Sequence, residues 1–78
     1  MDTQMIMDQM ELDFEELAKE HETAADNEHL WALGTSYPPI AEMHEENERR
    51  HRLLARMYRR MKEDILSFLE TYDDDEEN

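Results

Sequence analysis

The fold is decided by residues 40–72, whose sequence is IAEMHEENERRHRLLARMYRRMKEDILSFLETY. Steps of three and four residues along this stretch trace one stripe, which contains His44, Asn47, His51, Leu54, Tyr58, Met61, Ile65, Phe68 and Tyr72. A stripe with this spacing is typical of a helix that packs lengthwise against another helix, as in a coiled coil. Its second half is apolar, whereas its first half carries two histidines and an asparagine. The pattern predicts one long helix.

The residues before this stretch predict the partner helix. Asp8 and Glu11 have the spacing of a capping box, which marks a helix start. Gly34 suits the left-handed position just past a helix end, and Pro39 suits the first turn of the next helix. Between these signals the same stepping gives a second stripe of Met7, Met10, Phe14, Leu17, His21, Ala24, Glu28 and Trp31.

A short connection makes the two helices antiparallel neighbours, so facing residues should have numbers that add to about 72. This register places Glu11 opposite Lys62 and Ala18 opposite Ala55. We therefore predict an all-α protein. The expected parts are an antiparallel helical hairpin over 1–72 (helices at 4–33 and 40–72, turn at 34–39) and a disordered acidic tail at 73–78, where a run of carboxylates repels itself.

The second helix carries more apolar residues than one partner helix can cover, and the surplus comprises Leu53, Met57, Leu66 and Leu69. A chain of 78 residues buries only ~60% of its unfolded surface, and such chains often depend on oligomerisation. We expect two hairpins to pair as a homodimeric four-helix bundle, because symmetric dimers are the commonest oligomers. The alternative, that a different protein covers this surplus face, remains open.

The composition restricts the possible partners. The chain has 22 acidic and 8 basic residues and a net charge of −14, which disfavours direct binding of nucleic acid. Its expected partners are cationic, namely a basic protein surface or divalent metal ions. It has no cysteine, which excludes disulfides and thiolate metal sites. No apolar run has the length of a membrane span. These features predict a cytoplasmic protein without membrane contact.

The polar half of the two stripes offers candidate metal ligands: His21, Glu28, His44, Glu48 and His51. At the register above His21 lies opposite His51, and Glu28 lies opposite His44. Imidazole and carboxylate groups on facing helices hold zinc, iron or manganese in bundle proteins. Glu48 and His51 match the Glu-x-x-His motif of ferritin-like bundles, and the resemblance implies a divalent metal here. We expect no cofactor, because polar stripe residues also fix the register of paired helices, and a divalent metal is the alternative.

The acidic surface of the first helix is the second candidate, formed by Asp8, Glu11, Glu15, Glu16, Glu20, Glu22 and Asp26. Carboxylates along a rigid rod can imitate a phosphate backbone. In charge and size the chain resembles small acidic inhibitors of DNA-binding proteins, many of them encoded by phages. The resemblance implies an adaptor or inhibitor that engages a basic protein surface, including that of a nucleic-acid-binding protein. The surplus residues Leu53, Met57, Leu66 and Leu69 would anchor it.

Catalysis has no support in the sequence, which has no glycine-rich phosphate loop and no serine or cysteine beside a histidine. We therefore do not expect an enzyme. The arginines between 49 and 60 either grip an acidic partner or form a solvated helix surface, with i to i+4 pairs such as Glu46–Arg50 and Glu48–Arg52. A purely structural hairpin, as in helical assemblies or export chaperones, is the remaining alternative.

Overall fold

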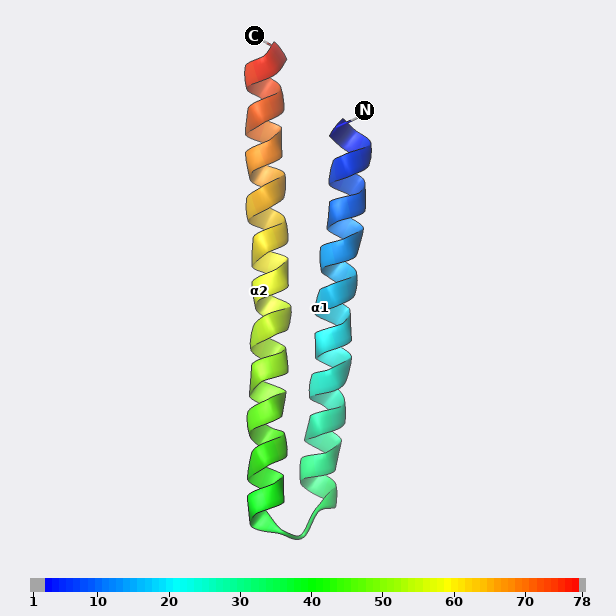
Figure 1. Cartoon of the computed structure of the whole chain (residues 1–78), viewed down its shortest axis with the longest axis vertical. Helices are drawn as coiled ribbons and strands as arrows, with labels where there is room; N and C mark the ends of the chain where they lie inside the picture. The colour runs from blue at the N-terminus through cyan, green and yellow to red at the C-terminus, as the bar shows by residue number, and fades with distance from the viewer. Residues whose placement is uncertain (1–2, 78) are drawn as a thin grey trace.

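The computed structural model describes the backbone of residues 3–77 and the side chains of residues 4–71. It contains two helices, α1 (Thr3–Gly34) and α2 (Pro38–Glu77), which run antiparallel along their whole shared length (Figure 1). The molecule is a rod measuring 63 × 16 × 11 Å. The predicted all-α helical hairpin is confirmed. Neither helix offers, within the described residues, an apolar stretch that could cross a membrane.

The turn contains residues 35–37 and is held by Tyr37. The Tyr37 carbonyl accepts the backbone N–H groups of Ile40 and Ala41, both at 3.1 Å. Pro38 begins α2, where its missing N–H leaves no bond unmade. The left-handed position predicted for Gly34 is wrong: Gly34 is the last residue of α1 and its φ is not positive.

The C-terminal end of α2 differs from the predicted boundary. We expected the helix to end at residue 72 and a disordered acidic tail at 73–78, whereas α2 continues to Glu77. No glycine or proline follows Tyr72 to stop the helix, and each added residue gains a backbone hydrogen bond. Residue 78 lies outside the described part of the chain.

The register between the helices agrees with the prediction. Three layers of facing side chains have residue numbers that add to 72: Phe14 with Tyr58, His21 with His51, and Glu28 with His44. Seven residues, or two helical turns, separate one layer from the next. The register counted from the predicted turn is therefore correct.

The two stripes, however, do not meet as predicted. The residues that fill the spaces between layers are small: Ala18 and Ala25 are 0% exposed, and Ala55 is 2% exposed. Their neighbours in the predicted stripes lie outside, with Leu17 at 36% and Met61 at 44% exposure. Ala18, Ala25 and Ala55 each stand four residues after a layer residue, and they lie between the helices. Leu17 and Met61 each stand three residues after a layer residue, and they are more exposed. Close packing of alanines therefore holds the pair together.

Candidate protein-binding site

The middle layer of the hairpin is a pair of histidines. The Nδ1 atoms of His21 and His51 are 2.9 Å apart, so one ring donates a hydrogen bond and the other accepts it. Their rings stack at a centroid distance of 5.2 Å, and the Tyr58 ring stacks on His21 at 5.6 Å. This contact satisfies two half-buried polar side chains inside the interface.

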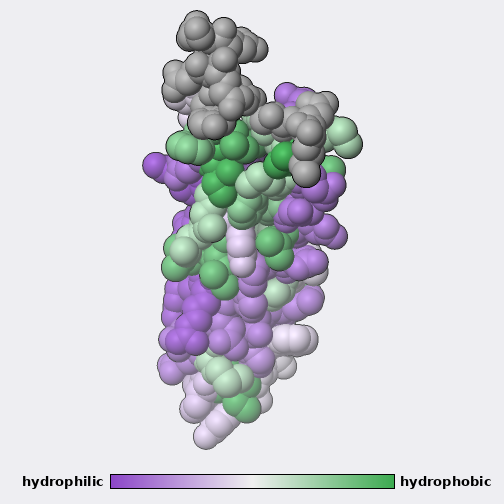
Figure 2. Space-filling view, turned by 45° about the horizontal axis from the view of Figure 1, so that its top comes forward, coloured by the Kyte–Doolittle hydropathy of each residue, from purple (hydrophilic) through white to green (hydrophobic). Residues whose placement is uncertain are grey.

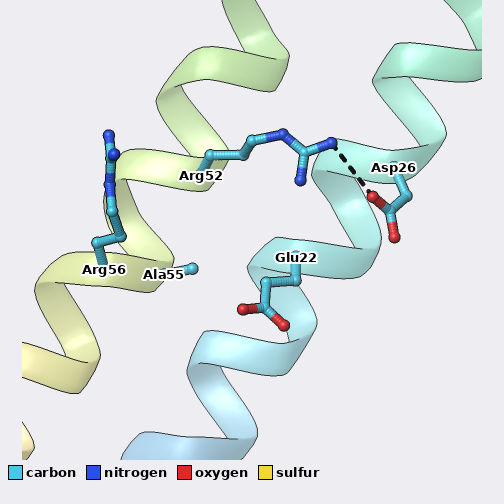
Figure 3. Close-up of a pocket in the computed structure, with 5 residues that line it drawn as sticks. All are labelled: Glu22, Asp26, Arg52, Ala55 and Arg56. Atoms are coloured by element: carbon cyan, nitrogen blue, oxygen red, sulfur yellow. Dashed lines mark hydrogen bonds and ion pairs between the residues drawn. The ribbon is translucent and has the colours of Figure 1, made fainter.

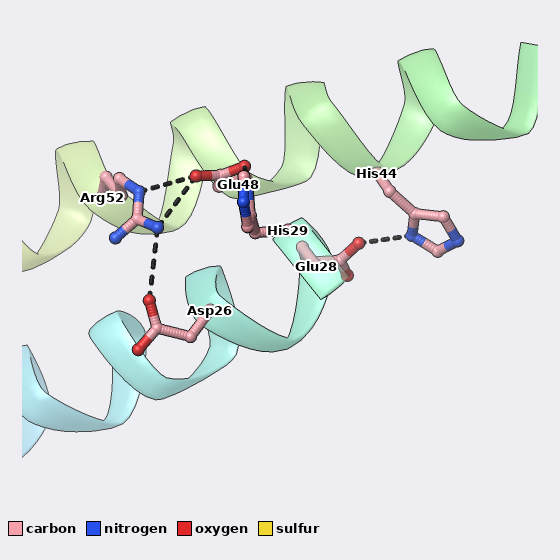
Figure 4. A network of polar contacts seen from close by, with 6 residues as sticks. All are labelled: Asp26, Glu28, His29, His44, Glu48 and Arg52. Atoms are coloured by element: carbon pink, nitrogen blue, oxygen red, sulfur yellow. Dashed lines mark hydrogen bonds and ion pairs between the residues drawn. The ribbon is translucent and has the colours of Figure 1, made fainter. Parts of the chain in front are cut away.

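The layer nearer the turn pairs an acid with a base. Glu28 Oε2 lies 2.5 Å from His44 Nδ1, and both side chains are mostly buried, at 13% and 19% exposure (Figure 4). The Trp31 ring lies against His44 at a centroid distance of 5.6 Å. A short contact between a carboxylate and an imidazole nitrogen fixes how the two helices meet near the turn.

The residues predicted to bind a metal form separate pairs. His21 contacts His51, and Glu28 contacts His44, whereas Glu48 is taken by other partners. Within the part of the chain that the structure describes, no three histidine or carboxylate side chains gather as a metal site would require. The single hairpin thus does not assemble the predicted set.

Glu48 has a partner that the sequence reasoning missed. Its Oε1 lies 3.0 Å from Nδ1 of His29, and its Oε2 accepts a hydrogen bond from Nε of Arg52 at 2.8 Å (Figure 4). These bonds lower the pKa of Glu48, the one from Arg52 being the largest cause. His29 lies off the predicted stripe, but it is one position after Glu28, on the side where the charges of the two helices meet. Its position next to Glu28, which faces α2, could have indicated that His29 reaches the other helix.

One side of the hairpin is closed by ion pairs between the helices. Arg59 donates to Glu15 at 3.0 Å and also to Glu22, while Lys62 Nζ donates to Glu15 at 2.9 Å. The two hydrogen bonds, from Arg59 first and Lys62 second, lower the pKa of Glu15 to about 2. The bond from Arg59 likewise lowers the pKa of Glu22. The predicted partner of Lys62 was Glu11, so the contact lies one helical turn further along.

The same side continues toward the turn with Arg52. Its Nη2 donates to Asp26 Oδ1 at 3.2 Å, beside a hollow lined also by Glu22, Ala55 and Arg56 (Figure 3). Arg56 makes no hydrogen bond or ion pair within the described residues, although it stands next to these charges. The arginines between 49 and 60 are therefore divided: Arg52 and Arg59 join the two helices, whereas Arg56 makes no such contact with a described residue.

The predicted acidic surface is divided in the same way. Glu15, Glu22 and Asp26 are engaged by basic side chains of α2. In contrast, Glu11, Glu16 and Glu20 make no hydrogen bond or ion pair with any described residue, and Asp8 only accepts one from Gln4. Glu16 and Glu20 share a shallow hollow with Asp13 and Leu17. Asp13 was missed, although it lies seven residues before Glu20.

The net charge resides unequally on the two helices. α1 carries nine acidic residues and one lysine, a net charge of −8. α2 carries twelve acidic and seven basic residues, a net charge of −5, and this excess comes from residues 73–77. Residues 38–71 of α2, which lie alongside α1, are neutral.

The predicted apolar anchor is only partly accessible. Leu53 and Met57 are about half exposed, whereas Leu66 and Leu69 are half-buried. Larger exposed side chains stand where the sequence placed the interior of the hairpin, among them Trp31 at 56% and Phe68 at 68% exposure. A long apolar surface thus remains open on the hairpin.

In comparisons with protein-family models, curated proteins and solved structures, this chain matches none of them.

Proposed function

We propose that the protein is a small acidic binding module, an adaptor or inhibitor without catalytic activity, which engages a basic protein surface inside the cell. The observation that carries this proposal is the charge of α1, −8 over its length. A surface with this charge raises the rate at which a cationic partner arrives and selects against acidic ones.

The proposed contact uses carboxylates that have no basic partner within the hairpin. Asp8, Glu11 and Glu16 meet this condition, because no described lysine, arginine or histidine contacts them. The engaged residues Glu15, Glu22 and Asp26 are no longer assigned to the contact. A basic partner that bound them would first have to displace Arg59 or Arg52.

The spacing of the acidic residues supports a protein that normally binds nucleic acid as the partner. The carboxylates of Asp8, Glu11 and Glu16 follow one another at about 6 Å on average along the helix axis, from a rise of ~1.5 Å per residue. Phosphates of one DNA strand repeat at ~3.4 Å along the duplex. These residues of α1 can therefore present charge to a basic groove at a spacing within about a factor of two of that of a nucleic-acid strand.

We propose further that the acting species is a homodimeric four-helix bundle. The open apolar side chains support this assembly, because exposed apolar surface on this scale marks a protein interface. The rival proposal is a purely structural hairpin whose charge serves only to keep it in solution.

The test compares two triple variants with the same change of net charge. One replaces Asp8, Glu11 and Glu16 by the matching amides; the control replaces Glu42, Glu45 and Glu70 of α2, which also lack partners among the described residues. Immobilised protein is offered the heparin-binding fraction of a lysate at low salt, with duplex DNA as competitor. We expect the α1 variant to lose capture, the control to keep it, and DNA to displace the captured protein. Equal loss in both variants, or capture that is insensitive to salt, would refute the proposal.

A further inference from the structure

The open apolar side chains recur along one side of both helices. They comprise Met10, Leu17 and Trp31 on α1 and Leu54, Met61 and Phe68 on α2, and we call this set the open face. On each helix its members recur at multiples of seven residues. Leu17, Trp31, Met61 and Phe68 are between 36% and 68% exposed. Figure 2 shows apolar side chains gathered in a band between hydrophilic edges, over both helices and toward the end near the termini.

The open face lies opposite the side closed by ion pairs. Each residue advances the helix by about 100°. Open-face residues stand three positions after a layer residue such as Phe14. Three positions turn the helix by about 300°, so an open-face residue lies about 60° to one side of the layer residue. Residues that form the cross-helix ion pairs, such as Glu15 and Arg59, stand one position after a layer residue, about 100° to the other side. The hairpin is thus closed by charge on one side and open with apolar side chains on the other.

This geometry explains the stripes that the sequence shows. Each stripe combines layer residues, which meet within the hairpin, with open-face residues, of which Leu17, Trp31, Met61 and Phe68 are largely exposed. Trp31 also contacts His44 across the hairpin. The centre of each stripe therefore lies between the direction of the partner helix and the direction in which the open-face residues point. A helix in a four-helix bundle has its apolar stripe in this orientation, because it contacts two neighbours rather than one.

We propose that a second copy of this chain covers the open face, with both turns at the same end of the bundle and α1 of each copy against α2 of the other. The inference specifies the geometry of the homodimer within the proposed function. Asp8, Glu11 and Glu16 remain on the outside of this bundle, so the proposed acidic contact and the dimer do not compete.

The edges of the open face decide the arrangement. On α1 the edge, one position before a layer residue, carries Asp13 and Glu20. On α2 the same position carries Arg50, Met57 and Asp64, and Arg60 lies beside Asp64. With the turns together, the observed register brings Asp13 of one copy near the level of Arg60 of the other, and Glu20 near Arg50. With the turns at opposite ends, α1 would face α1, and acidic edges would meet acidic edges. Opposite charges across the interface favour the first arrangement.

The arginines at this edge are free to make such contacts. Arg50 and Arg60 are bound only to acids on their own helix, Glu46 and Asp64, and all four side chains are at least 55% exposed. Pairs of this kind contribute little and are easily exchanged. The open face runs from the level of Trp31 to that of Phe68, about 40 Å at ~1.5 Å per residue, along a rod 63 Å long. A stable dimer buries about 800 Å² on each partner, and a second copy would pack along about two thirds of the rod.

The first experiment measures the distance between the two turns. The chain has no cysteine, so Ser36→Cys gives a single site for a nitroxide label in the exposed turn. With the turns together, pulsed electron spin resonance should give a distance of about 20–30 Å, allowing for helix spacings of 8–10 Å and the label arms. Opposite turns would be separated by nearly the length of the rod, 63 Å. A long distance would overturn the arrangement, and a monomeric mass without dipolar coupling would overturn the second copy altogether.

The second experiment exchanges charges at the edge. Glu20→Arg should weaken the dimer by about tenfold or more, because the contact occurs twice in a symmetric dimer. Arg50→Glu combined with Glu20→Arg should restore it, measured as the dimer dissociation constant by sedimentation. Both side chains are exposed, so neither change should affect folding of the hairpin. Failure of the double variant to recover would refute the α1-to-α2 contact.

The two proposals fail in distinguishable ways. Neutralising Asp8, Glu11 and Glu16 should abolish capture of a basic protein while leaving the distance between the turns unchanged. Added salt should weaken binding of a basic partner, whereas the dimer, held by apolar contact between two chains of charge −14, should persist or strengthen.

Discussion

Alanine packing between the helices can be tested at two adjacent positions that differ only in orientation. Ala25 is 0% exposed and lies inside the hairpin, whereas Ala24 is only half-buried and lies toward the open face. Replacing either residue by leucine makes the same change of composition at neighbouring sites of one helix, and alanine and leucine differ little in helix propensity. The pair therefore isolates the effect of packing.

The magnitude follows from the space available. Ala25 has no exposed surface into which a larger side chain could relax, and overpacking of such sites typically costs about 1–3 kcal/mol. For a domain of this size, a loss of about 2 kcal/mol should lower the melting temperature by about 8–16 °C. Ala24→Leu should cost much less in dilute protein, and its effect should grow with protein concentration, since Ala24 would meet the second copy.

The assay is thermal and urea unfolding followed by circular dichroism at 222 nm, at several protein concentrations because dimer stability depends on them. Equal destabilisation by Ala24→Leu and Ala25→Leu in dilute protein would refute the packing described above. An increase in stability for Ala25→Leu would refute it more directly, because it would show that a cavity exists beside Ala25, where the structure has close contact.

Three further predictions concern the polar contacts. Arg59→Met should destabilise the hairpin because Arg59 joins two carboxylates of α1, whereas Arg56→Met, the matched control without an ion pair among the described residues, should leave urea unfolding nearly unchanged. Because the pKa of Glu15 is lowered to about 2, its contribution should be fully present above the ordinary value near 4.5 and lost as the pH falls toward 2, in an acid titration that Glu15→Gln should flatten. His44→Ala should destabilise by leaving the mostly buried Glu28 without its partner, and Glu28→Gln in the same chain should recover part of that loss in thermal unfolding.

The hairpin and its register were predictable because their signals are local and redundant. Gly34 and the proline pair mark the turn, and the short connection leaves only an antiparallel pairing. Once the turn is placed, facing residues such as His21 and His51 follow from counting.

The interior of the hairpin was less predictable, because one apolar stripe can serve two interfaces. Leu17 and Met61 were assigned to the contact between the two helices on their size, yet Ala18 and Ala55 occupy it. A single sequence does not indicate that Leu17 and Met61 are more exposed than the alanines beside them. The alanines four residues after the layer residues could have indicated this interface. They allow the two helices to approach closely, and this close packing decides which residues lie between the helices.

The candidate site was predicted as a set of residue types but not as a set of contacts. Ionic contacts depend on side-chain reach, so Lys62 could have met Glu11 or Glu15, and the structure shows Glu15. Glu48 was placed with His44 and His51 by helical spacing, whereas it turns to His29 and Arg52. Spacing gives the face on which a side chain stands, but it does not determine which of several neighbours the side chain binds.

The contact between His21 and His51 has a consequence for tautomers. Two Nδ1 atoms at 2.9 Å hold one hydrogen between them, so in the neutral pair one ring is protonated on Nδ1 and the other on Nε2. The two rings are therefore inequivalent, and nitrogen chemical shifts should distinguish them.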